Sequence, residues 1–230
     1  MPKRDALPPA ARRWLDRCLP AATPTPDRVT LRQVGKLESN DRWLGFRATG
    51  PYWAQPLAFE WRARLGIMLG MWAIATDGHD GEVGWGGAKL WGLFDLGRRR
   101  GPEVQEVQLI RNIAELAWMP DLALSDPVLR WVDAGGDAFE IHADATDRAV
   151  AVRFDVDAHG DVVRASCEAR PYDVPEGYED APWRYELGGH REFGSIRAPA
   201  SVVATYDLPD GPWEYFRAEV VEMERLASEA

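Results

Sequence analysis

Residues 103–131 read EVQEVQLIRNIAELAWMPDLALSDPVLRW and form the one long helical pattern in the chain. Helical spacing places Arg111, Glu115 and Trp118 on one face. An apolar stripe lies on the opposite face and comprises Leu109, Ile110, Ile113, Leu116 and Ala117. We therefore predict a helix over Glu103–Met119 that is covered on both faces, by a core on one side and by a curved sheet on the other.

Prolines mark the limits of the predicted helices. Pro120 is predicted to end the long helix, because a proline inside a helix removes a hydrogen bond and clashes with the preceding turn. Ser125 or Asp126, placed ahead of Pro127, is predicted to cap a short second helix. Near the N-terminus, residues 10–19 follow a proline pair and predict another short helix.

The remainder of the chain alternates with a period of two, which is typical of strands. The clearest segment is Leu57–Leu65, where Trp61 belongs to the apolar side. Trp213–Met223 fits a strand better than a helix, although it contains good helix formers. Glycines within Val83–Leu93 predict either strong curvature or the close approach of another backbone.

Turns and loops are predicted where glycine, proline and charged residues gather. A turn is expected at Asp77–Gly81, and a solvated loop around Arg98–Arg100. Pro171–Pro182 is rich in proline, glycine and acidic residues and is predicted to be a long loop. The connections after Ala138 are short, so the strands that they join must be antiparallel neighbours.

These elements predict an α+β fold in a single domain spanning residues 1–230. The sheet should be large, antiparallel and formed by about ten strands, and a sheet of that size curls into a half-barrel. We expect a short N-terminal helix and two central helices packed on the concave face.

Charge and composition limit the class of function. The 230 residues carry a net charge of −10, which argues against a nucleic-acid partner. The N-terminus lacks the apolar core of a signal peptide. Leu65–Thr76 is the longest uncharged run and falls short of the roughly 20 residues that cross a bilayer. We expect a soluble, cytoplasmic protein with no membrane span.

The residues that usually mark a metal or catalytic site are scattered. The four histidines show no H-x-x-x-H spacing, and Cys18 and Cys167 are expected to be small core residues. The chain has no nucleophile elbow, no phosphate-binding loop and no dinucleotide fingerprint. We predict no metal, no cofactor and no catalytic residue.

The string LIRNIAELAWMP resembles the most recognisable motif of a bacterial family catalogued as a domain of unknown function. The motif residues here are Arg111, Glu115, Trp118 and Pro120, and Asn112 stands where that family usually has an aromatic residue. Further similar segments follow in order: LPPAARRWL, FEWRAR, TDGHDGEVGWGGAKLWG and PWRYELGGHREFGSIRAPASV. The resemblance implies a strand–helix–strand layout similar to the lipoprotein-carrier half-barrel, and it implies no particular chemistry.

The candidate site contains Trp61, Trp72, Arg111, Glu115 and Trp118. We predict that the three tryptophan rings converge on an apolar space with Arg111 at its polar edge, and 11 tryptophans in the chain favour such a lining. The alternative is that the three tryptophan rings pack against one another and leave no cavity, as is usual in protein interiors.

Two interpretations of Arg111 and Glu115 are open. The two residues form a buried structural ion pair, or the guanidinium of Arg111 faces the acidic group of a ligand. The leading prediction is a non-enzymatic protein that holds a hydrophobic, lipid-like or amphipathic small molecule. The alternatives are an enzyme that uses Glu115 as an acid or base, and a protein-interaction module.

Overall fold

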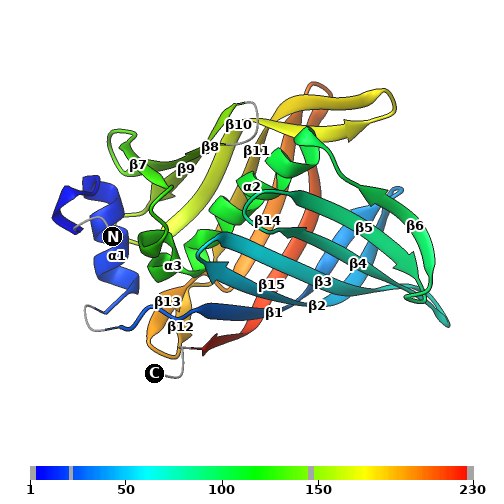
Figure 1. The fold of residues 1–230 in the computed structure, drawn as a ribbon, viewed down its shortest axis with the longest axis horizontal. Helices are drawn as coiled ribbons and strands as arrows, with labels where there is room; N and C mark the ends of the chain where they lie inside the picture. The colour runs from blue at the N-terminus through cyan, green and yellow to red at the C-terminus, as the bar shows by residue number, and fades with distance from the viewer. Residues whose placement is uncertain (1–3, 21–22, 145–147, 227–230) are drawn as a thin grey trace.

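The computed structural model describes residues 4–20, 23–144 and 148–226, and its main feature is one antiparallel sheet (Figure 1). The first six strands are β1 (Arg28–Ser39), β2 (Arg42–Ala54), β3 (Leu57–Met68), β4 (Met71–His79), β5 (Gly84–Leu90) and β6 (Phe94–Arg99). The strands after the helices are β7 (Arg130–Asp133), β8 (Ala138–Asp144), β9 (Ala149–Val156), β10 (Val162–Val174), β11 (Gly177–Gly188), β14 (Ser201–Leu208) and β15 (Gly211–Leu226). A separate hairpin is formed by β12 (Arg191–Phe193) and β13 (Ile196–Ala198).

The sheet consists of two meanders joined at its centre. Its order is β6-β5-β4-β3-β2-β1-β15-β14-β11-β10-β9-β8-β7, and every pairing is antiparallel. The first and last strands, β1 and β15, therefore pair in the middle, whereas β6 and β7 lie at the two edges. The predicted half-barrel is confirmed, with 13 strands instead of about ten.

The helical segment connects one edge of the sheet to the other. It comprises α2 (Pro102–Glu115), a 3-10 turn η2 (Leu116–Trp118) and α3 (Pro120–Ser125). Because it follows β6 and precedes β7, it has to cross the mouth of the half-barrel. α2 contacts β3, β4 and β5 on one arm and β9 and β10 on the other, and Figure 1 shows it between these two arms.

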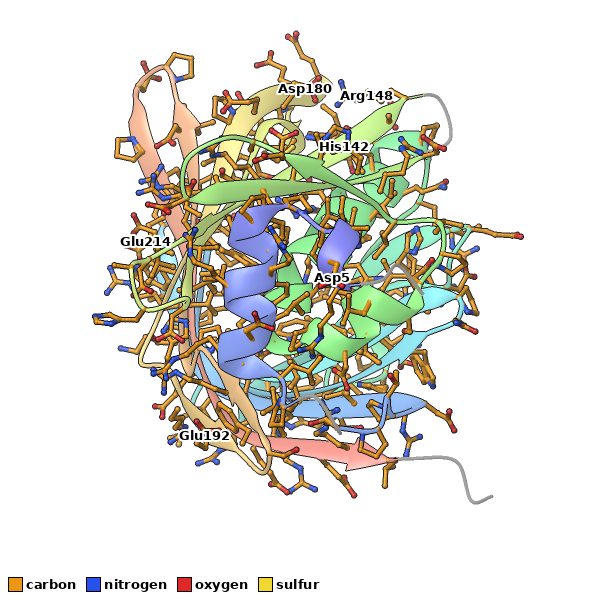
Figure 2. All side chains as sticks on the ribbon, turned by 90° about the vertical axis from the view of Figure 1, so that its left-hand side faces the viewer. Asp5, His142, Arg148, Asp180, Glu192 and Glu214 are labelled. Carbon is orange, nitrogen blue, oxygen red and sulfur yellow. The ribbon has the colours of Figure 1, made fainter. Side chains whose placement is uncertain are left out.

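The glycines of β5 allow α2 to approach the sheet. A Cβ atom at Gly84 would lie 2.6 Å from Cα of Gln105 and 2.8 Å from the carbonyl oxygen of Val104. No side chain fits in that space. The sequence predicts either strong curvature or the close approach of another backbone at these glycines, and the close approach is confirmed at Gly84. At the other arm, Arg148 donates from Nε to Glu106 of α2 at 2.7 Å and from Nη1 to Asp180 of β11 at 2.8 Å (Figure 2).

The N-terminal helix α1 (Pro9–Cys18) lies across one end of the half-barrel, in the foreground of Figure 2. It is preceded by a 3-10 turn η1 (Arg4–Ala6). Its Trp14 ring stacks on Phe139 of β8, with the ring centroids 5.5 Å apart. The predicted apolar stripe runs from α2 into η2 and is buried throughout, so helices and sheet share one core.

The second central helix begins earlier than predicted. The long helix also ends earlier than predicted, since α2 stops at Glu115 and is followed by the 3-10 turn η2. Pro120 is the first residue of α3, a position whose N–H has no intrahelical partner in any case. The prediction that Ser125 or Asp126 opens a helix is wrong. Asp126 instead follows the end of α3, and its carboxylate accepts a hydrogen bond from the N–H of Val128 at 2.8 Å.

The predicted loops at Arg98–Arg100 and Pro171–Pro182 are wrong over most of their length. Arg98 and Arg99 are exposed, as predicted, but they belong to the edge strand β6, which is exposed at every residue. β10 and β11 continue as a two-stranded ribbon beyond the stretch where β9 and β14 pair with them. Its inward face carries Arg170 and Tyr172 in place of an apolar row, so the sequence of the ribbon resembles that of a polar loop. Trp213–Met223 lies within strand β15, so the prediction of a strand rather than a helix is confirmed.

Candidate functional site

A buried polar cluster joins α2 to both arms of the half-barrel. Arg111 donates from Nε to Oε1 of Glu115 and from Nη1 to Oδ2 of Asp77, both at 2.9 Å. Tyr52 of β2 donates to Oε2 of Glu115 at 2.6 Å, and Tyr185 of β11 donates to Oε1 at 3.3 Å. Both oxygens of the Glu115 carboxylate are therefore engaged, and its side chain is 2% exposed. The Arg111–Glu115 pair is a buried part of the structure.

Strand register places the partners of Arg111 beneath it. Asp77 lies opposite Trp61 in the β3–β4 pairing, so both side chains point to the same face. The guanidinium carbon of Arg111 lies 5.0 Å from the centre of the Trp61 ring and 5.1 Å from that of Phe59. The predicted turn at Asp77–Gly81 is displaced, because β4 continues to His79 and Asp77 is a strand residue.

The surroundings fix the protonation of the cluster. Burial, and then the charge of Glu115, raises the pKa of Tyr52 and of Tyr185 above the ordinary value, so both phenols keep their protons. Burial alone would lower the pKa of Arg111, but the carboxylates of Glu115 and Asp77 outweigh it and raise this pKa. Burial raises the pKa of Asp77.

A cavity of about 460 Å³ lies between the two arms and is bordered by α2. Residues from β1, β3, β4, β5 and β6 line one side, and residues from β10, β11, β14 and β15 line the other. Much of the lining is aromatic and includes Trp61, Tyr185, Tyr206, Tyr215 and Phe216. Of the five predicted site residues, Trp61 and Arg111 line this cavity, whereas Glu115 lies behind Arg111.

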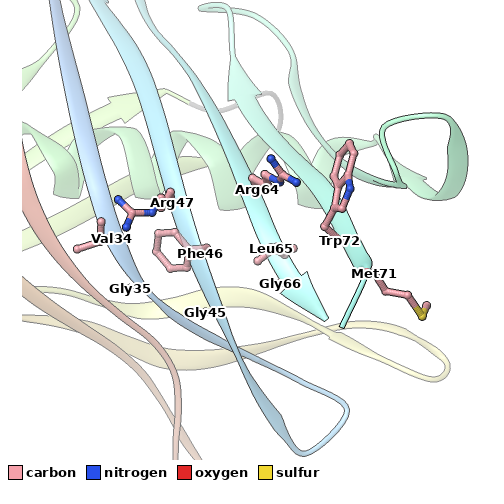
Figure 3. A pocket seen from close by; sticks show the side chains of 11 residues that line it. Val34, Gly35, Gly45, Phe46, Arg47, Arg64, Leu65, Gly66, Met71 and Trp72 are labelled. Carbon is pink, nitrogen blue, oxygen red and sulfur yellow. The ribbon is translucent and has the colours of Figure 1, made fainter. Parts of the chain in front are cut away.

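Trp118 and Trp72 lie elsewhere, so the predicted convergence of three tryptophan rings does not occur. Trp118 is fully buried, and its Nε1 donates to the carbonyl of Pro199 at 2.7 Å. Trp72 pairs with Gly66, which shares the outward-facing side of β3 with Arg64. The Arg64 guanidinium lies 4.5 Å from the centre of the Trp72 ring, beside an open hollow on the sheet (Figure 3).

Arg170 is a cavity residue that sequence reasoning missed. Ala165 and Cys167 of β10 face the core, so regular alternation would turn Arg170 outward. The register with β11 shifts between Cys167 and Arg170, where two residues oppose one. This β-bulge turns Arg170 and Tyr172 into the cavity. No local sequence pattern marks this bulge, because the change of inward positions from odd to even numbers between Cys167 and Tyr172 is a property of the register.

A second cavity, of about 450 Å³, adjoins the β3–β4 side of α2 and is lined in part by His79, Gln105 and Asp126. Nδ1 of His79 accepts a hydrogen bond from the N–H of Gly81 at 3.1 Å, and burial lowers the pKa of this histidine from 6.5. The unfolded chain therefore binds a proton more readily than the folded protein does.

We expect His79 to make the protein less stable in mild acid. As the pH falls through the unfolded value of 6.5, the free energy of unfolding should decrease. His79→Gln should reduce this decrease when urea unfolding is measured at pH 7.5 and pH 5.0, whereas the same change at the exposed His159 should leave it unaltered. An equal decrease in wild type and His79→Gln would contradict the prediction.

Within the described residues, no group of three or more His, Cys, Asp or Glu side chains could hold a metal ion. Among the helices of the described residues, none is long and apolar enough to cross a membrane.

The fold and its cavity define an antiparallel half-barrel crossed by a helical segment. The chain belongs to the DUF6544 family, a family of unknown function, which matches residues 2–218. This confirms the resemblance to a domain of unknown function. No curated protein matches the sequence.

Two solved structures are similar to the chain. A LolA superfamily protein from Nitrosomonas europaea is 10% identical, with a TM-score of 0.47 over 96% of this chain and 94% of that one. A putative outer membrane lipoprotein-sorting protein domain from Vibrio parahaemolyticus is also 10% identical, with a TM-score of 0.46 over 97% of this chain and 93% of that one.

Proposed function

We propose that this protein is a non-enzymatic binding protein that holds a hydrophobic or amphipathic small molecule in the cavity of the half-barrel. The observation that supports the proposal most strongly is the cavity itself, with a volume of about 460 Å³ and an aromatic lining from both arms. Small-molecule sites in proteins typically have volumes of about 300–1,000 Å³ and are mainly apolar with a few polar groups.

The chemistry of the lining favours an alkyl or aryl ligand. Trp61, Leu65 and Phe216 present apolar surface to the cavity, and each methylene group removed from water by such surface contributes about 0.8 kcal/mol. Glu115, the candidate acid or base of an enzyme, has both oxygens bonded to buried protein groups and is outside the cavity lining. Binding without catalysis therefore fits this arrangement better.

Native mass spectrometry of the protein purified from its own host should show a co-purified small molecule. In addition, palmitate titrated into delipidated protein should change the tryptophan fluorescence in a saturable way, since Trp61 and Trp213 line the cavity. Ala75→Phe should abolish this change, because Ala75 lines the cavity and the larger ring would fill it.

Val163→Phe is the matched control, since Val163 is exposed and does not line the cavity. This variant should bind palmitate as the wild type does. The proposal would be overturned by the absence of both a bound mass and a saturable fluorescence change in the folded wild-type protein, or by palmitate binding that Ala75→Phe leaves unchanged.

A further inference from the structure

Three arginines line the cavity, and they differ in how their charges are balanced. Arg99 forms an ion pair with Asp173 at 2.8 Å. Arg111 forms ion pairs with Asp77 and Glu115. Arg170, the third, has no carboxylate of the described residues within ion-pairing distance, here 4.0 Å.

Arg170 is nevertheless buried, with 5% of its surface exposed. Its Nη1 donates to the hydroxyls of Tyr206 and, at 3.5 Å, Tyr215, and its Nη2 lies 3.4 Å from the carbonyl oxygen of Val107. The guanidinium carbon lies 4.6 Å from the centre of the Trp183 ring. Nε has no hydrogen-bond acceptor within the part of the chain that the structure describes.

These neutral contacts leave the positive charge without a formal counter-charge. Tyr206 cannot supply one, because burial raises the pKa of its phenol and its hydroxyl donates to the carbonyl of Pro171 at 2.9 Å. A guanidinium withdrawn from water is normally paired with an anion. At Arg170 the missing anion has space to arrive from the cavity, which this side chain borders.

We propose that Arg170 binds the anionic head group, a carboxylate or a phosphate, of an amphipathic ligand whose apolar chain lies along the aromatic wall. This inference rests on the proposed function and adds the class of ligand to it. A guanidinium is suited to the task because its planar set of N–H donors matches the oxygens of both acids. Arg111 is less available for this role, since Nε and Nη1 are already bonded to carboxylates.

The test compares ligands with the same chain and different head groups. Wild-type protein is titrated with palmitate, hexadecyl phosphate and hexadecanol, and tryptophan fluorescence gives each Kd. We expect at least one of the two anions to bind about tenfold or more tightly than the alcohol, as charge-assisted hydrogen bonds are stronger than neutral ones. A preference for palmitate alone identifies a carboxylate ligand, and a preference for hexadecyl phosphate alone identifies a phosphate ligand.

Arg170→Met should remove the preference for the anion while leaving hexadecanol binding within about threefold of wild type. Because no carboxylate depends on Arg170, this variant should also retain the unfolding midpoint of ligand-free wild type. Arg99→Met is the matched control, since Arg99 borders the same cavity but is paired with Asp173. It should keep the anion preference.

The outcomes separate this inference from the proposed function. If none of the three ligands binds the wild type, the proposed function fails. If all three bind with equal affinity, or if Arg170→Met keeps the anion preference, cavity binding stands and the role of Arg170 is refuted. A large loss of stability in ligand-free Arg170→Met would also refute it, because the guanidinium would then be a support of the fold.

Discussion

Replacing Arg111 with alanine is expected to lower the free energy of unfolding by about 3–5 kcal/mol, the cost of removing one partner from a buried ion pair. Arg111 is the cationic partner of both Glu115 and Asp77, and the variant would leave two carboxylates without it. Urea unfolding followed by circular dichroism at pH 7 measures the effect. A loss below about 0.5 kcal/mol would show that the pair behaves like one on the surface.

Two further variants make this measurement specific. Arg98→Ala removes an exposed ion pair with Asp95 and should cost at most about 1 kcal/mol. The double variant Arg111→Met/Glu115→Leu removes both buried charges and should lose less stability than Arg111→Ala alone. If the double variant is the less stable of the two, the cost comes from lost packing and hydrogen bonds and not from an uncompensated charge.

Trp118→Ala should have an effect of similar size, about 3–5 kcal/mol, which is typical when a buried tryptophan is truncated. Trp118 is fully buried between the helical segment and the sheet, and its indole N–H satisfies the carbonyl of Pro199. Truncation would leave a cavity beside η2 and an unpaired carbonyl at Pro199. Thermal or urea unfolding would measure the loss.

Trp43→Ala provides the control, because Trp43 is 40% exposed and should lose much less. Trp118→Phe separates two contributions to the stability of the wild type. It keeps most of the ring but loses the N–H donor, so it should lie between wild type and Trp118→Ala, with a loss of about 1–3 kcal/mol for the unsatisfied carbonyl. Equal stabilities of Trp118→Ala and Trp43→Ala would contradict the role assigned to Trp118.

The helical segment could be predicted from sequence because both of its faces carry a signal. The apolar stripe and the Arg111–Glu115 spacing depend only on residues within a few turns of each other, and both are found as predicted. The pair has three additional partners that are distant in the sequence. Tyr52 and Tyr185 are 63 and 70 residues from Glu115, and Asp77 is 34 residues from Arg111. Only the register of the sheet brings them together, and no local pattern encodes that register.

The side of the sheet that a residue faces was the harder prediction. Trp72 is predicted to line the cavity together with Trp61, but it is out of phase with Ala73 and Asp77, which face inward. Arg170 was overlooked because a β-bulge changes the phase within one strand. A one-residue change in phase exchanges the two faces, so small errors in register produce large errors in a predicted site.

The pairing of β1 with β15 has a consequence for protein synthesis. β1 leaves the ribosome before the other strands of the sheet, whereas its partner β15 is the last of these strands to be translated. Until then the first meander presents an unpaired strand edge, a surface that readily joins other chains. β1 contains several charged or polar residues on this stretch, including Arg28, Arg32 and Lys36, which oppose such association. The two arms can join only after β15 has been translated, so their junction depends on one of the most distant pairings in the sheet.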